Sequence, residues 1–259
     1  MTTVFLENFI VHPRNDLVSQ QVSSGTQEHY ELDNLLAHIK NNKFKSLVDI
    51  GANIGFHTIH YAYHNPTSTV HAFEPSQDNI SVLEQNVNQY NLKNINIISS
   101  AVTGDKGTET LYGNEHNSGD TRIYKSDDYE PMETYDIDTV SLDDFFSDIN
   151  IDYIKMDTQG CELEIFYGGA QVISEQKPDI FMEFWPWGYN QRTPDEKYIN
   201  KFMEILTECR YELFEFSVNS PVITKVSGQN VYDYYRAMKL TNQHTNLFLL
   251  NSEKNCSSW

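Results

Sequence analysis

Cysteine is scarce in this chain of 259 residues, which contains only Cys161, Cys209 and Cys256. The three show no CxxC spacing and no Cys/His pairing, which argues against a disulfide framework and against a structural zinc site. The N-terminus has no basic region followed by an apolar run, and no stretch approaches the roughly eighteen apolar residues of a membrane helix. We therefore expect a cytoplasmic protein in a reducing compartment, without membrane insertion.

Basic residues are also few. Lys and Arg number 18 against 37 Asp and Glu, which gives a formal net charge of -19. A field of this sign repels nucleic-acid backbones and anionic membrane surfaces, so we expect no nucleic-acid partner. Most of the carboxylates are interpreted as a solvated acidic surface.

The chain also lacks the GxGxxG turn that holds a dinucleotide pyrophosphate at a helix N-terminus. It has instead a GxxxG turn, from Gly51 to Gly55, between an apolar run and a segment of helical periodicity. Glycines allow a sharp turn and a close approach of a ligand to the main chain. Asp49, at the edge of this turn, would repel a phosphate and suit a positively charged or hydroxyl-rich ligand. Taken alone, a turn that only packs helix against sheet is an equal alternative.

Apolar runs and helical patterns alternate from Ser46 onward, which predicts βαβ units and a mostly parallel sheet. We expect one domain over 1–259, with a lead-in over 1–45, a core over 46–250 and a tail over 251–259. The lead-in is predicted to hold a short strand, a polar segment through Ser24 and Gly25, and a helix. The predicted strands of the core sheet are Ser46–Ile50, Thr69–Phe73, Ile95–Ser99, Ile151–Met156, Asp179–Phe184, Tyr211–Phe216 and Thr245–Leu250. Other predicted elements are a strand at Val4–Ile10, helices at about Gln27–Asn41, Gly55–His64, Ser76–Gln89 and Pro194–Cys209, a hairpin strand at Thr108–Tyr112 and a polar insertion over Ser217–Lys239.

Glu74 ends the second core strand, about twenty residues past the glycine turn, where α/β nucleotide sites place the carboxylate that binds a ribose diol. A carboxylate can accept both hydroxyl protons of such a diol. Pro75 follows, and Ser76 is predicted to cap the next helix. The turn and Glu74 together indicate a cofactor that carries a diol but no phosphate.

Two further carboxylates, Asp157 and Glu183, end later strands, and open α/β sheets bind ligands at the carboxyl ends of their strands. A helix cap is the alternative for Asp157. Aromatic side chains over Trp185–Tyr189 suggest a sugar-binding rim beside Glu183, with ordinary core filling as an equal alternative. The polar loop Gly113–Pro131 carries His116, for which a surface histidine without a role is the stronger alternative.

Three segments, Val48–Gly55, Phe73–Pro75 and Ile154–Glu164, together resemble the FkbM-like family of S-adenosylmethionine-dependent methyltransferases. The resemblance spans roughly Ser46 to Glu183. It implies a Rossmann-like class I methyltransferase fold, with a seven-stranded, mostly parallel sheet, an antiparallel last strand and helices on both faces. It also implies O-methylation of a hydroxyl on a sugar, glycan or polyketide-type product. Asn117-x-Gly119-x-Thr121 loosely matches a loop of this family.

The resemblance also suggests roles for the candidate residues. S-adenosylmethionine is the expected cofactor and a small molecule or glycan the expected acceptor. Its methionine part is assigned to Asp49, Gly51, Asn53 and Gly55, and its ribose and adenine to Glu74, Pro75, Ser76, Ala101 and Val102. The proton acceptor and the group that orients the methyl acceptor are assigned to Asp157 and Glu183, with His116 third.

Three alternatives stay open. Asp157 and Glu183 could hold a divalent cation such as Mg²⁺, which would lower the pKa of the acceptor hydroxyl. The chain could instead be a non-catalytic module that binds cofactor or glycan on the same fold. A nicotinamide-dependent oxidoreductase is disfavoured by the missing GxGxxG. The sequence does not identify the acceptor, its reacting hydroxyl, the base or the oligomeric state.

Overall fold

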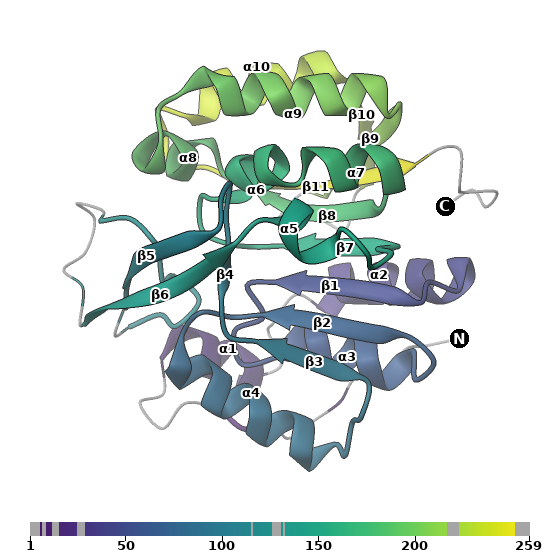
Figure 1. Ribbon diagram of the computed structural model, residues 1–259, viewed down its shortest axis with the longest axis vertical. Helices are drawn as coiled ribbons and strands as arrows, with labels where there is room; N and C mark the ends of the chain where they lie inside the picture. Colours follow the sequence, from purple (N-terminus) through teal and green to yellow (C-terminus); the bar gives the residue numbers. More distant parts are fainter. Residues whose placement is uncertain are drawn as a thin grey trace. The chain divides into compact units, whose positions relative to one another are not determined.

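The structure, a computed structural model, describes residues 6, 9–11, 16–24, 29–114, 116–125, 131, 133–216 and 223–251. The chain forms two compact units (Figure 1). Unit 1 comprises Met1–Ala101 and Thr108–Asp138, and unit 2 comprises Val102–Gly107 and Thr139–Trp259. None of the helices in these described ranges is long and apolar enough to cross a membrane.

Unit 1 is built around three parallel strands, in which β2 pairs with β1 on one side and β3 on the other. Strands β1 and β2 are buried after their first residues, as is typical of parallel strands covered on both faces, whereas β3 is largely half-buried. The elements of this unit are α1 (Leu17–Ser24), α2 (His29–Asn42), β1 (Ser46–Ile50), α3 (Phe56–His64), β2 (Thr69–Phe73), α4 (Gln77–Gln89) and β3 (Ile95–Ile98). The strands β4 (Ala101–Val102), β5 (Gly107–Tyr112) and β6 (Thr134–Val140) follow, and each has residues on both sides of a unit boundary.

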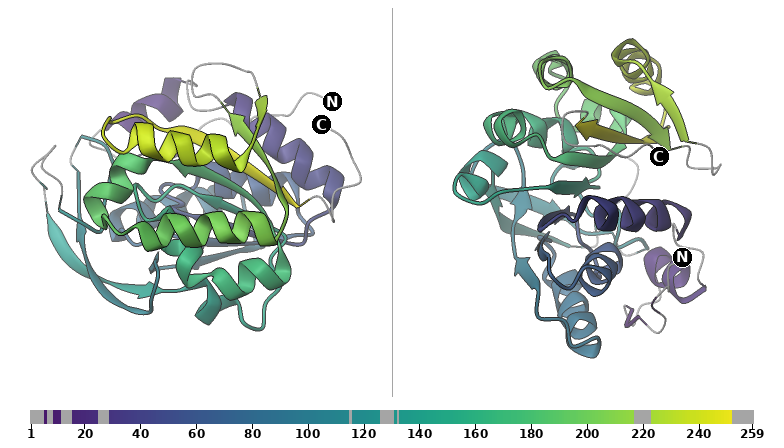
Figure 2. Two further views of the ribbon diagram at one scale, coloured as in Figure 1. Left: turned by 90° about the horizontal axis from the view of Figure 1, so that it is seen from above. Right: turned by 90° about the vertical axis from the view of Figure 1, so that its right-hand side faces the viewer.

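Unit 2 contains a mixed sheet. Strand β7 pairs in parallel with β8, and β11 runs antiparallel between β8 and β9, with β10 antiparallel on the outer side of β9. Helices α9 and α10 contact each other and lie side by side in two views (Figures 1 and 2). Its remaining elements are α5 (Leu142–Phe146), β7 (Tyr153–Met156), α6 (Glu162–Gly168), α7 (Ala170–Gln176), β8 (Asp179–Phe184), α8 (Pro186–Arg192), α9 (Glu196–Glu208), β9 (Tyr211–Phe216), β10 (Ile223–Val226), α10 (Gly228–Met238) and β11 (Thr245–Asn251).

The predicted class is confirmed: the chain is an α/β protein with mostly parallel strands, and its last strand, β11, is antiparallel. All the strands predicted for the core sheet are present, and β10 adds one more. The polar insertion predicted over Ser217–Lys239 contains two elements that the sequence analysis does not name, β10 at Ile223–Val226 and α10 at Gly228–Met238.

The lead-in also differs from the prediction. The polar segment before Gly25 forms helix α1. Of the strand predicted at Val4–Ile10, only Leu6, Phe9 and Ile10 lie within the described residues, and these three are not in a strand. The predicted tail over 251–259 lies outside the described residues except Asn251, which ends β11.

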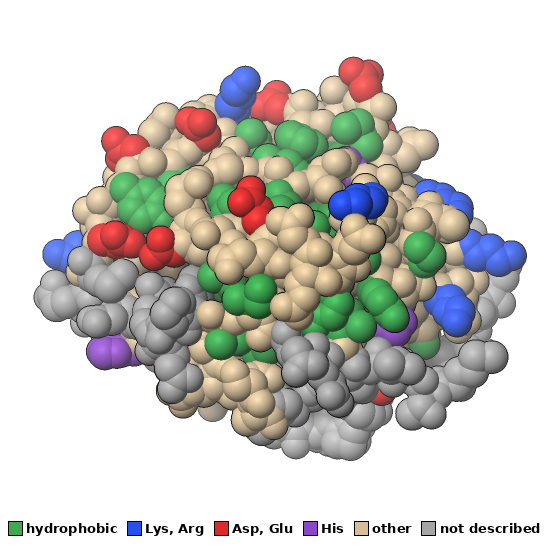
Figure 3. Space-filling model, turned by 90° about the horizontal axis from the view of Figure 1, so that it is seen from below, with side chains coloured by type: hydrophobic (Ala, Val, Ile, Leu, Met, Phe, Trp, Pro, Cys, Tyr) green, Lys and Arg blue, Asp and Glu red, His purple; other side chains and the backbone are tan. Residues whose placement is uncertain are grey.

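Figure 3 shows how the charged side chains of the described residues are distributed on one face of the structure. On the face drawn in Figure 3, the described Asp and Glu side chains lie in separate clusters, and small hydrophobic groups lie between them. The net charge of -19 is therefore not concentrated in one patch of this face.

Candidate functional site

The glycine turn of unit 1 connects β1 to α3 through three left-handed backbone conformations. The φ angles are 79° at Gly51, 50° at Asn53 and 92° at Gly55. The N–H groups of Gly51 and Ala52 both donate to the Phe73 carbonyl oxygen, at 3.0 Å. A Cβ at Gly55 would collide with the Leu83 side chain, so both conformation and space require glycine there. The sequence prediction of a sharp turn at this position is confirmed.

Glu74 binds this turn to the start of α4. One carboxylate oxygen accepts the Asn53 N–H at 2.8 Å, and the other accepts the Ser76 N–H at 2.9 Å and the Asn79 side-chain amide at 3.1 Å. The residue is only 4% exposed. Glu74 therefore holds two of the predicted cofactor residues, Asn53 and Ser76, through their backbones.

The other candidate cofactor residues are buried or half-buried. Asp49 is 0% exposed and accepts a hydrogen bond from the Thr58 hydroxyl at 2.6 Å. Ser76 is the N-cap of α4, as predicted, and accepts the Asn79 N–H at 3.4 Å. Pro75 is half-buried, and Ala101 and Val102 are buried in β4. The structure thus brings Asp49, Gly51, Asn53, Gly55, Glu74, Pro75 and Ser76 together around the ends of β1 and β2 in unit 1.

The polar loop predicted to carry function lies against this turn within unit 1. The Asn79 amide also donates to the Ser118 carbonyl at 3.4 Å, and a Cβ at Gly119 would lie 3.5 Å from the Asn53 amide nitrogen. His116 is exposed and contributes its backbone to the loop, since its carbonyl accepts the Leu17 N–H at 3.0 Å. The loop is therefore fixed beside the candidate cofactor residues.

Asp16, which the sequence prediction missed, anchors this loop. One of its carboxylate oxygens accepts the Ser19 N–H at 3.0 Å, and the other accepts the Ser118 N–H at 3.2 Å. An aspartate three residues before the N–H that it accepts is the ordinary N-cap pattern, which could have indicated α1. Nothing in the sequence indicates the second bond, because it joins positions far apart in the chain.

Asp157 and Glu183 lie close together in unit 2, at the ends of the paired parallel strands β7 and β8. The Gln159 amide donates to Asp157 at 2.9 Å and to Glu183 at 3.3 Å, and so bridges the two carboxylates. Lys155 lies 3.7 Å from Asp157, and His244 lies 3.9 Å from Glu183. The predicted proximity of the two carboxylates is present within this unit.

Burial changes the acid–base properties around these carboxylates. It raises the pKa of Glu162 to about 7, against hydrogen bonds from Thr158 that lower it, and the charge of Asp157 raises it further. Burial lowers the pKa of His244, while Asp157 acts in the opposite direction. The pKa of the Tyr189 hydroxyl is well above its usual value, because of burial first and then the charge of Glu162.

The aromatic segment Trp185–Tyr189 is not an open rim but the start of α8. Trp185 and Tyr189 are each 5% exposed, and the Tyr189 hydroxyl donates to the Glu183 carbonyl at 3.0 Å. Trp187 is half-buried and contacts the Trp185 ring, with 5.2 Å between ring centroids. The burial of Trp185 and Tyr189 favours core filling for these two residues.

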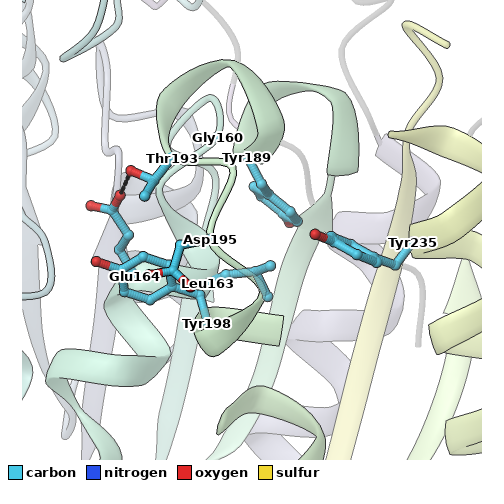
Figure 4. A pocket seen from close by; sticks show the side chains of 8 residues that line it. All are labelled: Gly160, Leu163, Glu164, Tyr189, Thr193, Asp195, Tyr198 and Tyr235. Atoms are coloured by element: carbon cyan, nitrogen blue, oxygen red, sulfur yellow. Dashed lines mark hydrogen bonds between the residues drawn. The ribbon is translucent and has the colours of Figure 1, made fainter. Parts of the chain in front are cut away.

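A small pocket lies in the same unit (Figure 4). It combines tyrosine side chains with acidic groups, and it includes Gly160 of the turn that follows Asp157. At its edge, Glu164 accepts a hydrogen bond from the Thr193 hydroxyl at 2.6 Å and lies 3.3 Å from the Arg192 guanidinium. The lining residues are Gly160, Leu163, Glu164, Tyr189, Thr193, Asp195, Tyr198 and Tyr235.

The described residues offer few side chains that could coordinate a metal ion together. Among the residues that the structure describes, no three or more His, Cys, Asp or Glu side chains gather as a metal site would require. The side-chain NH₂ group of Gln159 lies between Asp157 and Glu183 and donates hydrogen bonds to both. A cation at this position would need oxygen ligands instead.

The alternation of strands and helices around the candidate sites is that of a Rossmann-like fold. Residues 49–213 match the family model described as Methyltransferase FkbM domain, which covers more than half of the chain. The chain therefore belongs to the FkbM methyltransferase domain family.

Individual relatives are distant. "Methyltransferase 1" of Beauveria bassiana (strain ARSEF 2860) is 22% identical over 142 residues, which are 47% of this chain and 57% of that protein. The crystal structure of the methyltransferase FkbM from Methylobacillus flagellatus KT has a TM-score of 0.50 and 19% identity, and the match covers 80% of this chain and 43% of that one. An O-methyltransferase from Bacillus cereus, solved with SAH, has a TM-score of 0.49 and 11% identity, over 90% of this chain and 88% of that one. The chain thus spans less than two thirds of the curated relative and of the FkbM structure.

Proposed function

We propose that this methyltransferase uses S-adenosylmethionine and methylates a hydroxyl of a sugar, glycan or glycosylated natural product. The observation that carries the proposal is the Gly51–Gly55 turn, with its left-handed backbone tied by Glu74 to the start of α4. This turn combines glycines, which let a ligand approach the main chain closely, with the carboxylates of Asp49 and Glu74, which suits a cationic, diol-bearing ligand and not a pyrophosphate.

The residues present fit such a donor. Asp49, Gly51, Asn53 and Gly55 would hold the methionine part, and the Glu74 carboxylate, which already holds the turn, would accept hydrogen bonds from the ribose diol. Pro75, Ser76, Ala101 and Val102 would line the ribose and adenine. When bound, S-adenosylmethionine supplies an electrophilic methyl carbon.

Asp157 and Glu183 serve the methyl acceptor in this proposal. Methyl transfer to an alcohol needs an in-line approach of the oxygen and a base for its proton. One carboxylate takes that proton and the other orients the hydroxyl, while the Gln159 amide keeps the two in a fixed relation. His116 is the third candidate for the base.

The test is transfer of labelled methyl from S-adenosylmethionine to a panel of monosaccharides and glycosides. We expect labelling of at least one acceptor, and Asp157→Asn should lower kcat by about 100-fold, the usual contribution of a general base. Asp143→Asn is the matched control, because its carboxylate lies in the same unit and only accepts N–H groups of α7. Equal turnover of Asp157→Asn and wild type at saturating acceptor would remove Asp157 as the base.

The same assay separates the alternatives. Loss of turnover in excess chelator, restored by Mg²⁺, would favour metal assistance, and full turnover would exclude it. Binding of S-adenosylmethionine without transfer to any acceptor would favour the non-catalytic module.

A further inference from the structure

Glu162 is the first residue of α6 and is 0% exposed. Its carboxylate points back toward the turn that precedes the helix. One oxygen accepts the Thr158 N–H at 2.7 Å and the Thr158 hydroxyl at 2.9 Å, and the other accepts the Gly160 N–H at 3.2 Å. Three donors of one turn thus converge on a single buried carboxylate.

That turn has a backbone which needs such support. Two consecutive residues, Gln159 and Gly160, are left-handed, with φ angles of 56° and 103°. A non-glycine residue in this conformation is strained and persists where its surroundings hold it. A Cβ at Gly160 would lie 2.8 Å from the Gly188 carbonyl carbon, so α8 packs directly on the turn. In this conformation the Gln159 side chain reaches Asp157 and Glu183.

We propose that Glu162 is a positioning residue for the acceptor side of the reaction: its carboxylate fixes the Thr158–Gly160 turn and thereby the Gln159 amide that joins Asp157 to Glu183. The catalytic consequence rests on the proposed methyl transfer. The structural part of the proposal, that Glu162 holds the turn, does not depend on methyl transfer.

The charge state of Glu162 should matter, because both of its oxygens face donors. The charged and titratable groups around it are Asp157 at the end of β7, Tyr189 of α8, and Glu183 of β8 beside Tyr189. Burial, with Asp157, raises the pKa of Glu162 to about 7. Opening of the turn exposes this carboxyl to water, where it ionises more readily, so the turn should open more easily above this pH than below it.

Hydrogen exchange of the Thr158 and Gly160 amides, followed by NMR at pH 6 and pH 8 and corrected for intrinsic rates, tests the structural part. Wild type should show greater protection at pH 6 than at pH 8, because opening of the turn lets the Glu162 carboxyl ionise. Glu162→Gln should raise exchange at both amides by about tenfold or more and abolish the pH difference. Asp143→Asn, which removes an equivalent carboxylate from the Gln171 and Val172 amides, should leave the 158–160 amides unchanged.

The inference is overturned if the Thr158 and Gly160 amides of Glu162→Gln exchange at the wild-type rate. It is also overturned if these amides of wild type are equally protected at pH 6 and pH 8. The wild-type comparison needs no variant, so it decides even if Glu162→Gln does not fold.

The activity readout separates this inference from the proposed function. Glu162→Gln should lower kcat while the affinity for S-adenosylmethionine stays unchanged, and its kcat should lose the pH dependence near pH 7 that ionisation of Glu162 gives wild type. A Glu162→Gln enzyme with the wild-type pH profile would contradict the positioning role. If wild type transfers no methyl group at all, the proposed function fails, and the exchange data alone decide whether Glu162 holds the turn.

Discussion

Two turns of this chain use the same backbone device in different surroundings. In unit 1, left-handed Asn53 and Gly55 lie between a strand and a helix, and the buried Glu74 accepts a turn N–H. In unit 2, left-handed Gln159 and Gly160 lie between a strand and a helix, and the buried Glu162 does the same. Each turn thus combines left-handed backbone with an internal carboxylate that compensates its N–H groups.

The difference is where the carboxylate comes from and what it faces. Glu74 follows the neighbouring strand β2 and accepts hydrogen bonds from Asn53, Ser76 and Asn79. Glu162 belongs to the helix that the turn begins, and Asp157 lies near enough to raise its pKa further. In the first arrangement the Glu74 carboxylate is held by three donors. In the second, the protonation of the Glu162 carboxylate changes with pH in the neutral range.

The largest effect should come from breaking the first turn. Gly55→Ala puts a side chain into a left-handed conformation and against Leu83, and should cost about 2–4 kcal/mol of the free energy of unfolding. Urea denaturation measures this. The control Gly113→Ala in the same unit meets its nearest neighbour only at ordinary contact distance, 3.4 Å, and should change stability by less than about 1 kcal/mol. Equal losses in both variants would contradict the requirement for glycine at position 55.

The second turn should differ in the pH dependence of stability. The pKa of Glu162 is about 7 in the folded protein against 4.5 for the unperturbed group, so its contribution is complete below about pH 4.5 and lost as pH rises through about 7. At about 1.4 kcal/mol for each pH unit between these values, the loss is roughly 3–4 kcal/mol at most. The stability of Glu162→Gln relative to wild type should therefore rise between pH 5 and pH 8, measured by urea denaturation. A relative stability that falls over this range would show that the three hydrogen bonds outweigh burial.

The smallest effect concerns the loop beside the first turn. Asp16→Ala removes the N-cap of α1 and the bond to Ser118, and should cost about 1–2 kcal/mol and weaken S-adenosylmethionine binding a few-fold. Asp195→Ala is the matched control, because it removes the N-cap of α9 in unit 2. It should cost a similar stability and leave cofactor affinity unchanged. Equal cofactor affinity in both variants would remove the polar loop from the cofactor site.

The sequence predicted the strands of both units because their apolar runs are long and flanked by clear turn residues, as at Ser46–Ile50 and Thr69–Phe73. It missed α1, whose sequence LVSQQVSS has no long apolar face and which depends on distant partners such as the His116 carbonyl. It also missed α10, although Ser227 and Asn230 form a capping box that the sequence spells out.

Within the site, residue identity was more predictable than residue role. Glu74 was expected as a ribose ligand, and its bonds to Asn53 and Ser76 could not be foreseen, since they depend on the fold of the turn. Glu162 belongs to Ile154–Glu164, one of the three segments that resemble the FkbM-like family, but the sequence assigns it no role. Its burial and its hydrogen bonds from Thr158 and Gly160 are properties of the folded chain. Pro186 at the start of α8 could have indicated that Trp185–Tyr189 is helical.

The most direct test of a methyl-donor site at the Gly51–Gly55 turn is calorimetric titration of S-adenosylmethionine into wild type, Glu74→Ala and Glu162→Gln, each verified as folded by circular dichroism. Wild type should bind with a Kd below about 1 mM. Glu74→Ala should bind at least about tenfold more weakly, because the turn loses an acceptor for Asn53, and Glu162→Gln should bind as wild type does. No binding to wild type at millimolar cofactor, or equal affinities of wild type and Glu74→Ala, would contradict a donor site at this turn.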